Sequence, residues 1–402
     1  MKRTLAGASA CAGYGFGIMI ASILQTSGIC RIAASSPVSF FLMSPSRILA
    51  IKLADLGDVL NITPALRALR LTFPDAKIDA LVNPHTAMIL EGSGLVDEVV
   101  IFPKTQFEGV TALKPTAWRP LARSMRSLRA RKYDTVVNFH HLTTRMGRAK
   151  QWALVKAAGA ETVVGLDNGH GRWLTLSVAD DGFGAMREVE YWLALAKRLG
   201  AVATDLSLHL PLNEAEQARA DALLAESGLG DQPFIVIHPG SGGFSLARRW
   251  EPEKFAALAA ALYRRHNLPA ALVGSPGDDV AAVVAAGGGP LIDLSGRTSF
   301  RELAGVLRRA RAFVGADSGV MHLAAAARTP VVAIFGPSNH RAWAPWTPYS
   351  PSRVVRLDLP CSPCSYVGHS VGRREGCAAR TCLADLTVDQ VLTAVETLLG
   401  DG

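Results

Sequence analysis

The segment from Phe313 to Ser338 combines residue types and spacings that could bind an anionic ligand. It reads as a strand, a tight polar turn, a small-residue helix and a β-branched strand, over 312–315, 316–319, 320–327 and 331–335. A strand that feeds a turn and then a helix presents unpaired backbone N–H groups and the positive end of a helix dipole. We therefore expect this turn to bind phosphate, against the alternative of a capped helix that binds no ligand.

Individual residues of this turn and helix suit that prediction. Asp317 or Ser318 can cap the helix through its side chain. Gly319 allows a ligand to approach the backbone closely. His322 lies one turn into the helix and therefore points towards the same opening.

A second candidate lies directly after the first predicted strand, in the run Leu53-Ala54-Asp55-Leu56-Gly57-Asp58. The run lacks the GxGxxG spacing of a dinucleotide-binding fingerprint. It places Asp58 after a glycine at the carboxyl end of a parallel strand, where open α/β sheets bind ligands. Asp58 is therefore a candidate catalytic carboxylate, and a helix cap is the alternative.

Two glycine-rich loops follow strands in the second half of the chain. The loop 238–243 contains Ser241 and Gly242, and its backbone N–H groups can wrap oxyanions. A plain glycine turn is the alternative reading of this loop. The loop 273–279 ends in carboxylates and could hold a ribose or a base edge, or only begin a helix.

Arg248 and Arg249 precede Trp250 and the helix that Pro252 opens. A guanidinium at this place could donate two parallel hydrogen bonds to a diphosphate. Two surface arginines beside a tryptophan are the alternative. The sequence contains no convincing DxD pair that would bridge a metal ion to a diphosphate.

The C-terminal part of the chain is rich in cysteine, with Cys361, Cys364, Cys377 and Cys382. This spacing is compatible with zinc binding or with disulfides. A reducing cytosol would disfavour stable disulfides. We expect any role of these cysteines to be structural, with zinc as the candidate metal.

Strand and helix patterns alternate along the chain from residue 47. Apolar runs predict buried parallel strands at 48–53, 77–82, 98–102 and 135–138, with helices at 63–71, 86–91 and 119–131. The 63–71 helix has Pro64 at its first position. After a connector at 208–226, the alternation resumes over 234–238, 254–266, 270–273, 279–286, 291–293 and 300–311. We predict an α/β protein with two doubly wound Rossmann-like domains that face a cleft, over 46–212 and 213–402.

The composition is typical of a globular protein, with 49% hydrophobic and 19% charged residues among 402. The formal net charge of +8 suits anionic ligands such as nucleotide diphosphates, or an anionic membrane surface. The sequence has no basic patch interleaved with aromatic residues, no zinc-finger spacing and no basic helix followed by heptads. We therefore expect no nucleic-acid partner.

Residues 1–45 form an apolar leader with two interpretations. Residues 4–30 carry no charge, which is typical of a weak signal sequence or a signal anchor. Glycine, serine and threonine dilute the segment. The alternative is that the chain starts at Met43, and we favour it because the α/β pattern is complete from residue 46.

Taken together, these segments resemble glycosyltransferase family 9, the ADP-heptose:lipopolysaccharide heptosyltransferases. The resemblance runs from about residue 47 to the C-terminus and rests on four ordered blocks. The blocks are RILAIKLADLGDVLNITPALRALR, VIHPGSGGFSLARRWEPEKFAALA, LSGRTSFRELAGVLRRARAFVGADSGVMHLAAAARTPVVAIFGPS and the CSPC segment with its later cysteines.

The resemblance implies a GT-B fold, with an acceptor-binding N-terminal domain, a nucleotide-sugar-binding C-terminal domain and inverting transfer. Asp58 matches the family's proposed general base, and Asp55 beside it is an acceptor-binding candidate. The implied donor-binding residues are Ser241, Gly242, Arg248, Thr298, Asp317, Ser318, Gly319 and His322. Among these, Arg248 stands where the family commonly has lysine, which changes the shape of the phosphate contact but not its charge.

The implied reaction moves a heptose from ADP-heptose to the inner core, Kdo or heptose, of a lipid A–Kdo type glycolipid. The implied enzyme is cytoplasmic and peripheral at the inner face of the cytoplasmic membrane, and it requires no cofactor for catalysis. The basic helix at 119–131 could dock on that membrane, or be an ordinary solvated face. The alternatives are another nucleotide sugar, a protein acceptor, or a nucleotide-sugar-binding protein without catalysis.

Overall fold

The computed structural model describes residues 44–102, 115–243 and 245–400. Nearly all of the predicted leader, residues 1–43, lies outside these described residues. Within the described ranges, no helix combines the length and the apolar character needed to cross a membrane.

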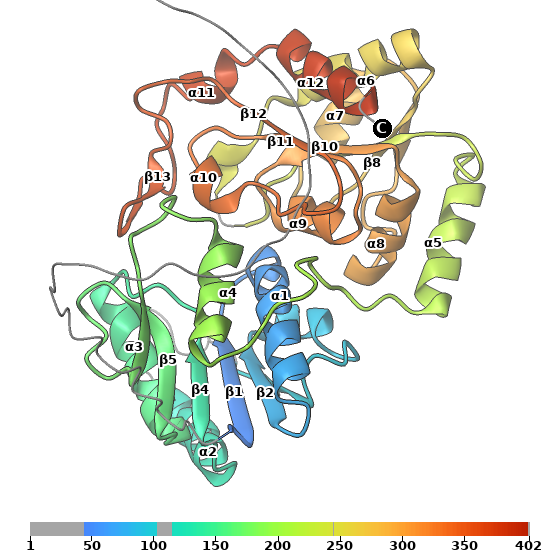
Figure 1. Ribbon diagram of the computed structural model, residues 1–402. Coiled ribbons are helices and arrows are strands. Elements are labelled where there is room, and N and C mark those ends of the chain that lie inside the picture. The colour runs from blue at the N-terminus through green and yellow to red at the C-terminus, as the bar shows by residue number, and fades with distance from the viewer. Residues whose placement is uncertain (1–43, 103–114, 244, 401–402) are drawn as a thin grey trace, which may run out of the picture. The chain divides into compact units, whose positions relative to one another are not determined.

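The first half of the described chain forms a parallel six-stranded sheet in the order β3-β2-β1-β4-β5-β6 (Figure 1). Its strands are β1 (Arg47–Lys52), β2 (Lys77–Val82), β3 (Glu98–Ile101), β4 (Thr135–Asn138), β5 (Thr162–Asp167) and β6 (Leu176–Ala179). Its helices are α1 (Leu56–Thr72), η1 (Pro84–Ile89), α2 (Pro115–Ala130), α3 (Arg145–Ala158) and α4 (Glu188–Arg198). Because side chains alternate along a strand, Ile48 and Ala50 pack with α1 and α4. Leu49 and Ile51 pack with α2 and α3 on the other face.

The second half forms another parallel six-stranded sheet, in the order β12-β11-β10-β7-β8-β9. Its strands are β7 (Ile235–His238), β8 (Ala270–Leu272), β9 (Leu291–Asp293), β10 (Ala312–Ala316), β11 (Val331–Ile334) and β12 (Ser352–Val355). Its longer helices are α5 (Glu214–Glu226), α6 (Pro252–His266), α7 (Val280–Ala286), α8 (Phe300–Arg309), α9 (Gly319–Ala326) and α12 (Val388–Gly400). Short elements complete it: η4 (Leu246–Arg248), α10 (His340–Trp343), β13 (Ser365–Val367), β14 (Ser370–Gly372) and α11 (Thr381–Ala384).

These two sheets confirm the predicted α/β class. The proposed domain boundary between residues 212 and 213 lies in the connector from α4 to α5 and stays a prediction. The segment 145–198, which contains α3, β5, β6 and α4, had no predicted elements.

The predicted start of the first helix was wrong. α1 begins at Leu56, so Pro64 lies inside the helix and Asp58 lies in its first turn. Pro64 has no N–H to donate to the carbonyl of Leu60, four residues earlier. Thr63 replaces that donor, because its Oγ1 hydroxyl donates to the Leu60 carbonyl at 2.6 Å. The second predicted helix, at 86–91, is the 3-10 helix η1 and begins two residues earlier.

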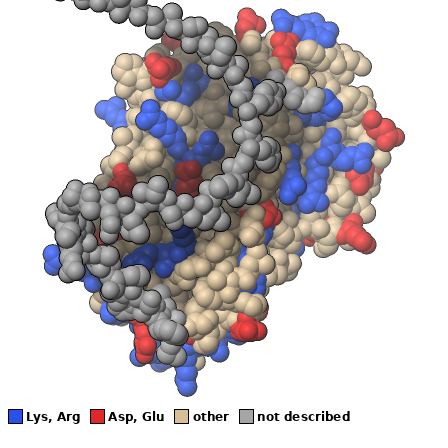
Figure 2. Space-filling model, in the orientation of Figure 1, with Lys and Arg blue, Asp and Glu red and all other residues tan. Residues whose placement is uncertain are grey.

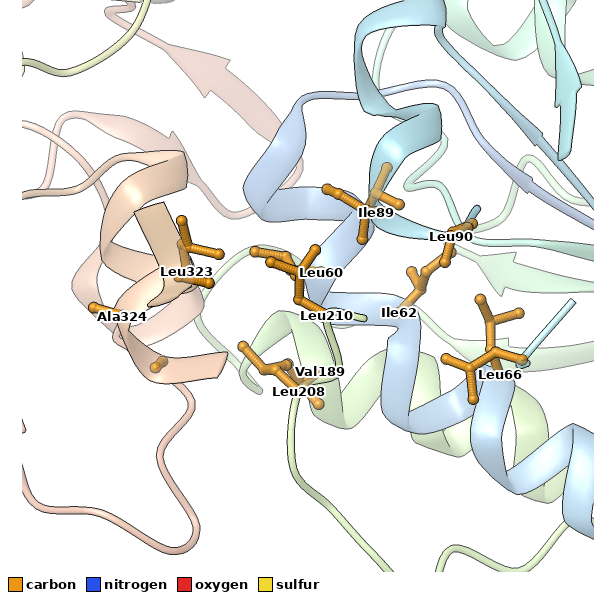
Figure 3. Packing of buried hydrophobic residues seen from close by; sticks show 14 of the residues in the cluster. Leu60, Ile62, Leu66, Ile89, Leu90, Val189, Leu208, Leu210, Leu323 and Ala324 are labelled. Atoms are coloured by element: carbon orange, nitrogen blue, oxygen red, sulfur yellow. The ribbon is translucent and has the colours of Figure 1, made fainter. Parts of the chain in front are cut away.

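Side chains from both halves share one hydrophobic cluster around α1. Leu60 of α1 lies beside Leu323 of α9 in Figure 3. Leu208 and Leu210, from the connector, lie close to Val189 of α4 in the same cluster. Burying one such leucine contributes about 2 kcal/mol relative to leaving it in water. The packing of α1 against α9 therefore fixes where the first turns of these two helices lie.

Candidate active site

The N-terminal ends of α1 and α9 meet with almost no space between their backbones. A Cβ atom added at Gly57 would lie 2.6 Å from the His322 ring and 3.4 Å from the Gly319 Cα atom. A side chain at position 57 would therefore push α9 away, and glycine is required for this close approach. Two helix N-termini, each with unpaired N–H groups and a positive dipole end, converge here. The turn at 316–319, which the sequence predicts to bind the phosphates of the donor and which we call the donor turn, is thereby brought together with the run that contains Asp58.

Asp58 presents a partly exposed carboxylate from the first turn of α1, with 27% of its side chain exposed. The ammonium group of Lys52, at the end of β1, lies 3.4 Å from an oxygen of this carboxylate. Lys52 is buried, and its ammonium also lies 4.2 Å from the centre of the Trp192 ring. A buried ammonium needs such partners, so this contact orients Asp58. The sequence reading missed Lys52, because a lysine at the end of an apolar strand usually reaches solvent.

Arg248 and Asp317 lie side by side at the donor turn. The Arg248 guanidinium is 3.0 Å from the Asp317 carboxylate and donates to the Asp317 backbone carbonyl at 3.4 Å. Both side chains are largely buried. Arg248, the predicted phosphate contact, and Asp317, another implied donor-binding residue, are therefore neighbours.

Ser318 caps α9 and belongs to a buried hydrogen-bonded chain. Its Oγ accepts from the Met321 N–H at 3.3 Å and lies 3.3 Å from His238 Nδ1. His238 Nε2 in turn lies 3.4 Å from the Asp278 carboxylate. Burial alone would raise the pKa of Asp278, but hydrogen bonds from His238 and Ser275 outweigh it and hold that pKa well below its usual range. The chain links the ends of β7, β8 and β10 and holds the donor turn in position.

His322 lies on α9, just after the donor turn, and its side chain is buried. Burial lowers its pKa, and this effect outweighs the opposing carboxylates of Asp317 and Asp58. The imidazole is therefore neutral at pH 7. Its Nδ1 atom is buried and has no hydrogen-bond partner among the described residues.

The loop after β7 is held by its own polar groups. The Ser241 hydroxyl donates to the Ser245 carbonyl at 2.7 Å and accepts from Arg249 Nε at 3.2 Å. Arg249 also pairs with Asp279 at 3.1 Å, so it braces the loop. Gly242 has a φ of +66°, which favours glycine, and no atom of the described residues lies within 4 Å of where its Cβ would be. This loop could therefore offer backbone N–H groups to an anion, while the Ser241 side chain is already engaged.

Asp55 and Thr298 lie at the margins of this arrangement. Asp55 is at the N-cap position of α1, and its exposed carboxylate lies 3.5 Å from His85 Nε2. Thr298 lies in the turn between β9 and α8, at the same carboxyl edge of its sheet as the donor turn. No hydrogen bond or ion pair within the described part of the chain joins Thr298 to the residues around Asp58.

Tyr366, on β13, borders the site and was missed from the sequence. Its ring packs on Trp343 and Phe183, with centres 4.4 and 5.1 Å apart. Burial raises the pKa of its hydroxyl, with a lowering influence from Arg248 and a raising one from Asp58. These electrostatic partners show that Tyr366 lies near both. A tyrosine among the C-terminal cysteines carried no sequence signal of that proximity.

Two histidines after β4 join separate segments of the first half, and the first of them contacts the loop that leads to Asp58. His140 Nε2 accepts from the Leu53 N–H at 2.8 Å. His141 lies between the Asp180 and Glu188 carboxylates, at 3.0 and 3.1 Å. Burial alone would lower the pKa of His141, but Glu188 and Asp180 outweigh burial and raise it to about 9. The imidazole is therefore charged at pH 7 and joins three segments of the first half.

The four C-terminal cysteines line one cavity of about 300 Å³. Their thiols are free, so they form no disulfide with each other. Burial raises the pKa of Cys364 and Cys382, and the neighbouring thiols raise it further. In the ranges that the structure describes, no three His, Cys, Asp or Glu side chains are grouped as metal ligands. The predicted ligands thus share a cavity but are not assembled around one point.

Comparison with known proteins identifies the family of this chain. A model of glycosyltransferase family 9 (heptosyltransferase) matches residues 121–373, which is more than half of the chain. Lipopolysaccharide heptosyltransferase 3 of Escherichia coli is 28% identical over 304 residues, covering 72% of this chain and 84% of the relative.

Solved structures share the fold. The glycosyl transferase family 9 structure from Veillonella parvula DSM 2008 has a TM-score of 0.69 at 23% identity, covering 89% of this chain and 98% of that one. The E. coli ADP-heptose lps heptosyltransferase II structure has a TM-score of 0.63 at 23% identity, covering 88% and 99%. With its two parallel sheets in the GT-B arrangement, this chain belongs to glycosyltransferase family 9 and is a glycosyltransferase.

Proposed function

We propose that this enzyme transfers heptose from ADP-heptose to the inner core of lipopolysaccharide, onto Kdo or heptose, with inversion. The observation that carries the proposal is the contact of Gly57 with His322 and Gly319, which sets the Asp58 carboxylate beside the donor turn. The choice of sugar rests on the relatives, since the similar E. coli protein is named a lipopolysaccharide heptosyltransferase.

In this mechanism Asp58 is the general base. The acceptor hydroxyl must lose its proton as its oxygen attacks the anomeric carbon, and a nearby carboxylate can accept that proton. Attack from the side opposite the leaving diphosphate inverts the anomeric centre. Lys52 positions this carboxylate, because its ammonium nitrogen lies 3.4 Å from an Asp58 carboxylate oxygen. Asp55, exposed at the start of α1, would bind acceptor hydroxyls.

The leaving ADP would be stabilised by groups around α9. Arg248 offers a delocalised charge and paired N–H donors to the diphosphate. The backbone N–H groups at the start of α9 and in the loop at Ser241 and Gly242 would donate further hydrogen bonds to the diphosphate. Asp317 would then exchange its contact with Arg248 for hydrogen bonds from sugar hydroxyls. This set supplies the positive charge from the protein itself, and no cofactor is required.

Two further residues have supporting roles in the proposal. His322 is neutral and has a buried Nδ1 without a partner among the described residues, so a hydrogen bond to it from a ligand or a shifted neighbour would be favourable. Thr298, after β9, is proposed to lie near the adenine.

Asp58→Asn is expected to lower kcat by about 10²- to 10⁴-fold, because it removes the base but keeps the shape of the side chain. ADP release from ADP-heptose is measured with truncated lipid A–Kdo acceptors. Asp75→Asn is the control, since it removes an exposed aspartate in the turn after α1 and should leave the rate unchanged.

The same assay separates the alternatives. An unchanged rate in Asp58→Asn would contradict its role as base. Turnover of UDP- or GDP-sugars but not of ADP-heptose would show that the enzyme uses another donor. Transfer to a protein but not to a glycolipid would show that it uses another acceptor. Donor binding without turnover on any acceptor would identify a nucleotide-sugar-binding protein.

Lys52→Met is expected to lower kcat about tenfold while the KM for the donor stays unchanged, because it disturbs only the orientation of Asp58. Steady-state kinetics check this split, and a thermal melt checks that the variant is folded. Lys156→Met, at an exposed position of α3, is the control. A loss of donor affinity with unaltered kcat would contradict the positioning role.

We also propose that the enzyme is peripheral at the inner face of the cytoplasmic membrane, where the acceptor is anchored. α2 carries the exposed arginines Arg119, Arg123, Arg126 and Arg129, spaced three or four residues apart along one side of the helix. Such a basic face attracts anionic lipids, at about 1 kcal/mol per arginine.

A double replacement tests this surface. Arg123→Glu with Arg126→Glu is expected to weaken sedimentation with phosphatidylglycerol vesicles by more than tenfold. Arg172→Glu with Arg264→Glu, two exposed arginines outside α2, is the control. Equal sedimentation of both double variants would leave α2 as an ordinary solvated face.

The C-terminal cysteines are proposed to hold a structural zinc ion after a rearrangement of their side chains. Their thiols already line one cavity, and zinc takes four thiolate ligands at about 2.3 Å. Metal analysis of purified protein is expected to find about one zinc per chain, and Cys361→Ser should reduce it. Metal-free protein with every cysteine titrating as a free thiol would show the prediction to be wrong.

A further inference from the structure

A cavity of about 780 Å³ lies away from the Asp58 site, beside the middle of α1. Its walls come from α1, the connector before α5, helix α8 and the chain just after α9. Among its lining residues are the arginines Arg67, Arg301, Arg308 and Arg328. We call it the arginine cavity. Arg67 follows Asp58 on α1 by about 13 Å along the helix axis. Arg328 follows the end of α9 that is opposite to Gly319.

Two of these arginines are anchored by the fold. Arg67 donates to the carbonyls of Asp205 and Ser207 at 3.1 and 2.8 Å, and pairs with the Asp205 carboxylate at 3.1 Å. Arg301 donates to a backbone carbonyl in η1 at 2.8 Å and lies 3.7 Å from the Glu216 carboxylate. Carbonyl groups hold a guanidinium in place while most of its charge still acts on its surroundings.

The other two arginines are exposed and keep their charge available. Arg308 and Arg328 have no carboxylate at ion-pair distance in the described part of the chain. Arg328 lies over the Tyr349 ring, at 5.3 Å from its centre. Figure 2 shows Lys and Arg side chains gathered on the right, over the region where Figure 1 draws α8.

Nothing else in the lining balances these charges. Asp205 is the single acidic side chain among the described lining residues, and it already pairs with Arg67. His209 adds no charge, because burial lowers its pKa and the charge of Arg67 lowers it further. Asp205 pairs with Arg67, and Glu216, outside the lining, lies near Arg301. The charges of Arg308 and Arg328 therefore stay uncompensated among the described residues and make the cavity attractive to anions.

The wall that carries His209 is preformed. Leu208 and Leu210, on either side of it, are buried in the hydrophobic cluster of Figure 3. The His209 N–H donates to Thr63 Oγ1 at 2.9 Å. Thr63 is the residue that compensates for Pro64 inside α1, so the connector is attached to the helix at a fixed point. A ligand would therefore bind to an already ordered surface, without the entropic cost of ordering the connector.

We propose that the arginine cavity binds a free phosphorylated small molecule with more than one phosphate group. Guanidinium groups favour phosphate oxygens because they can donate two parallel hydrogen bonds. The volume falls in the range of small-molecule sites, about 300–1,000 Å³. Arginines from α1, α8 and the chain after α9 would share the ligand, so binding would join both halves of the chain. This site is separate from the donor turn and does not depend on the proposed function.

Calorimetric titration of pyrophosphate into the full-length protein at low ionic strength tests the proposal. We expect binding that weakens at least about tenfold in the double variant Arg308→Gln with Arg328→Gln, which removes the two unpaired charges. Arg309→Gln, next to Arg308 but paired with Asp221, is the matched control and should bind as wild type. A second pyrophosphate-binding event at the donor turn would be recognised by its loss in Arg248→Gln. That event should be unchanged in the double variant of Arg308 and Arg328.

Proton NMR of the His209 imidazole gives an independent reading, since its resonance should shift on addition of pyrophosphate in wild type but not in the double variant. Wild-type affinity in the double variant, or no pyrophosphate binding outside the donor turn, would overturn the proposal. Binding to phosphatidic acid vesicles that needs Arg308 and Arg328, without binding of free pyrophosphate, would also overturn it, in favour of a lipid headgroup.

Discussion

The contact between Gly57 on α1 and His322 on α9 is the constraint on which the arrangement of the site depends. Each helix follows the carboxyl end of a central strand, β1 or β10, and its first turn carries a polar residue of the site. Because the two helix ends touch, the Asp58 carboxylate after one sheet lies close to the turn at 316–319 after the other. The leucines of the shared cluster hold the helices in this position. Any side chain at position 57 would move Asp58 away from the turn at 316–319.

Neighbouring residues around the donor turn have different tasks. Arg249 is buried, bonded to Ser241 and paired with Asp279, so it belongs to the framework that joins the strand ends. Arg248, the preceding residue in the chain, lies instead beside Asp317. The framework satisfies its own charges, as buried ionic groups must. In the proposed function, the Arg248–Asp317 pair is the part that the diphosphate and the sugar rearrange.

The sequence was informative where a local pattern has a single structural meaning. A strand, a polar turn and a small-residue helix predicted the position of Asp317 and His322, and a glycine after a buried strand indicated Asp58. Pro64 misled the helix assignment, because the compensating hydroxyl of Thr63 could not be recognised without coordinates. Partners that are distant in sequence were missed for the same reason. No local sequence pattern indicates that Lys52 is buried beside an aromatic ring, or that Tyr366 lies near Arg248 and Asp58.

The hydrophobic cluster that contains Leu60 and Leu323 has a further consequence for folding. Because it takes side chains from both sheets and from the connector, neither sheet buries all of its apolar surface alone. The two halves of a GT-B chain are often imagined as independent modules, but here they share part of one core. Loss of that core in one half would expose leucines in the other, so the described chain should unfold cooperatively. Exchanging one half for that of a relative would then succeed only if the shared side chains were exchanged with it.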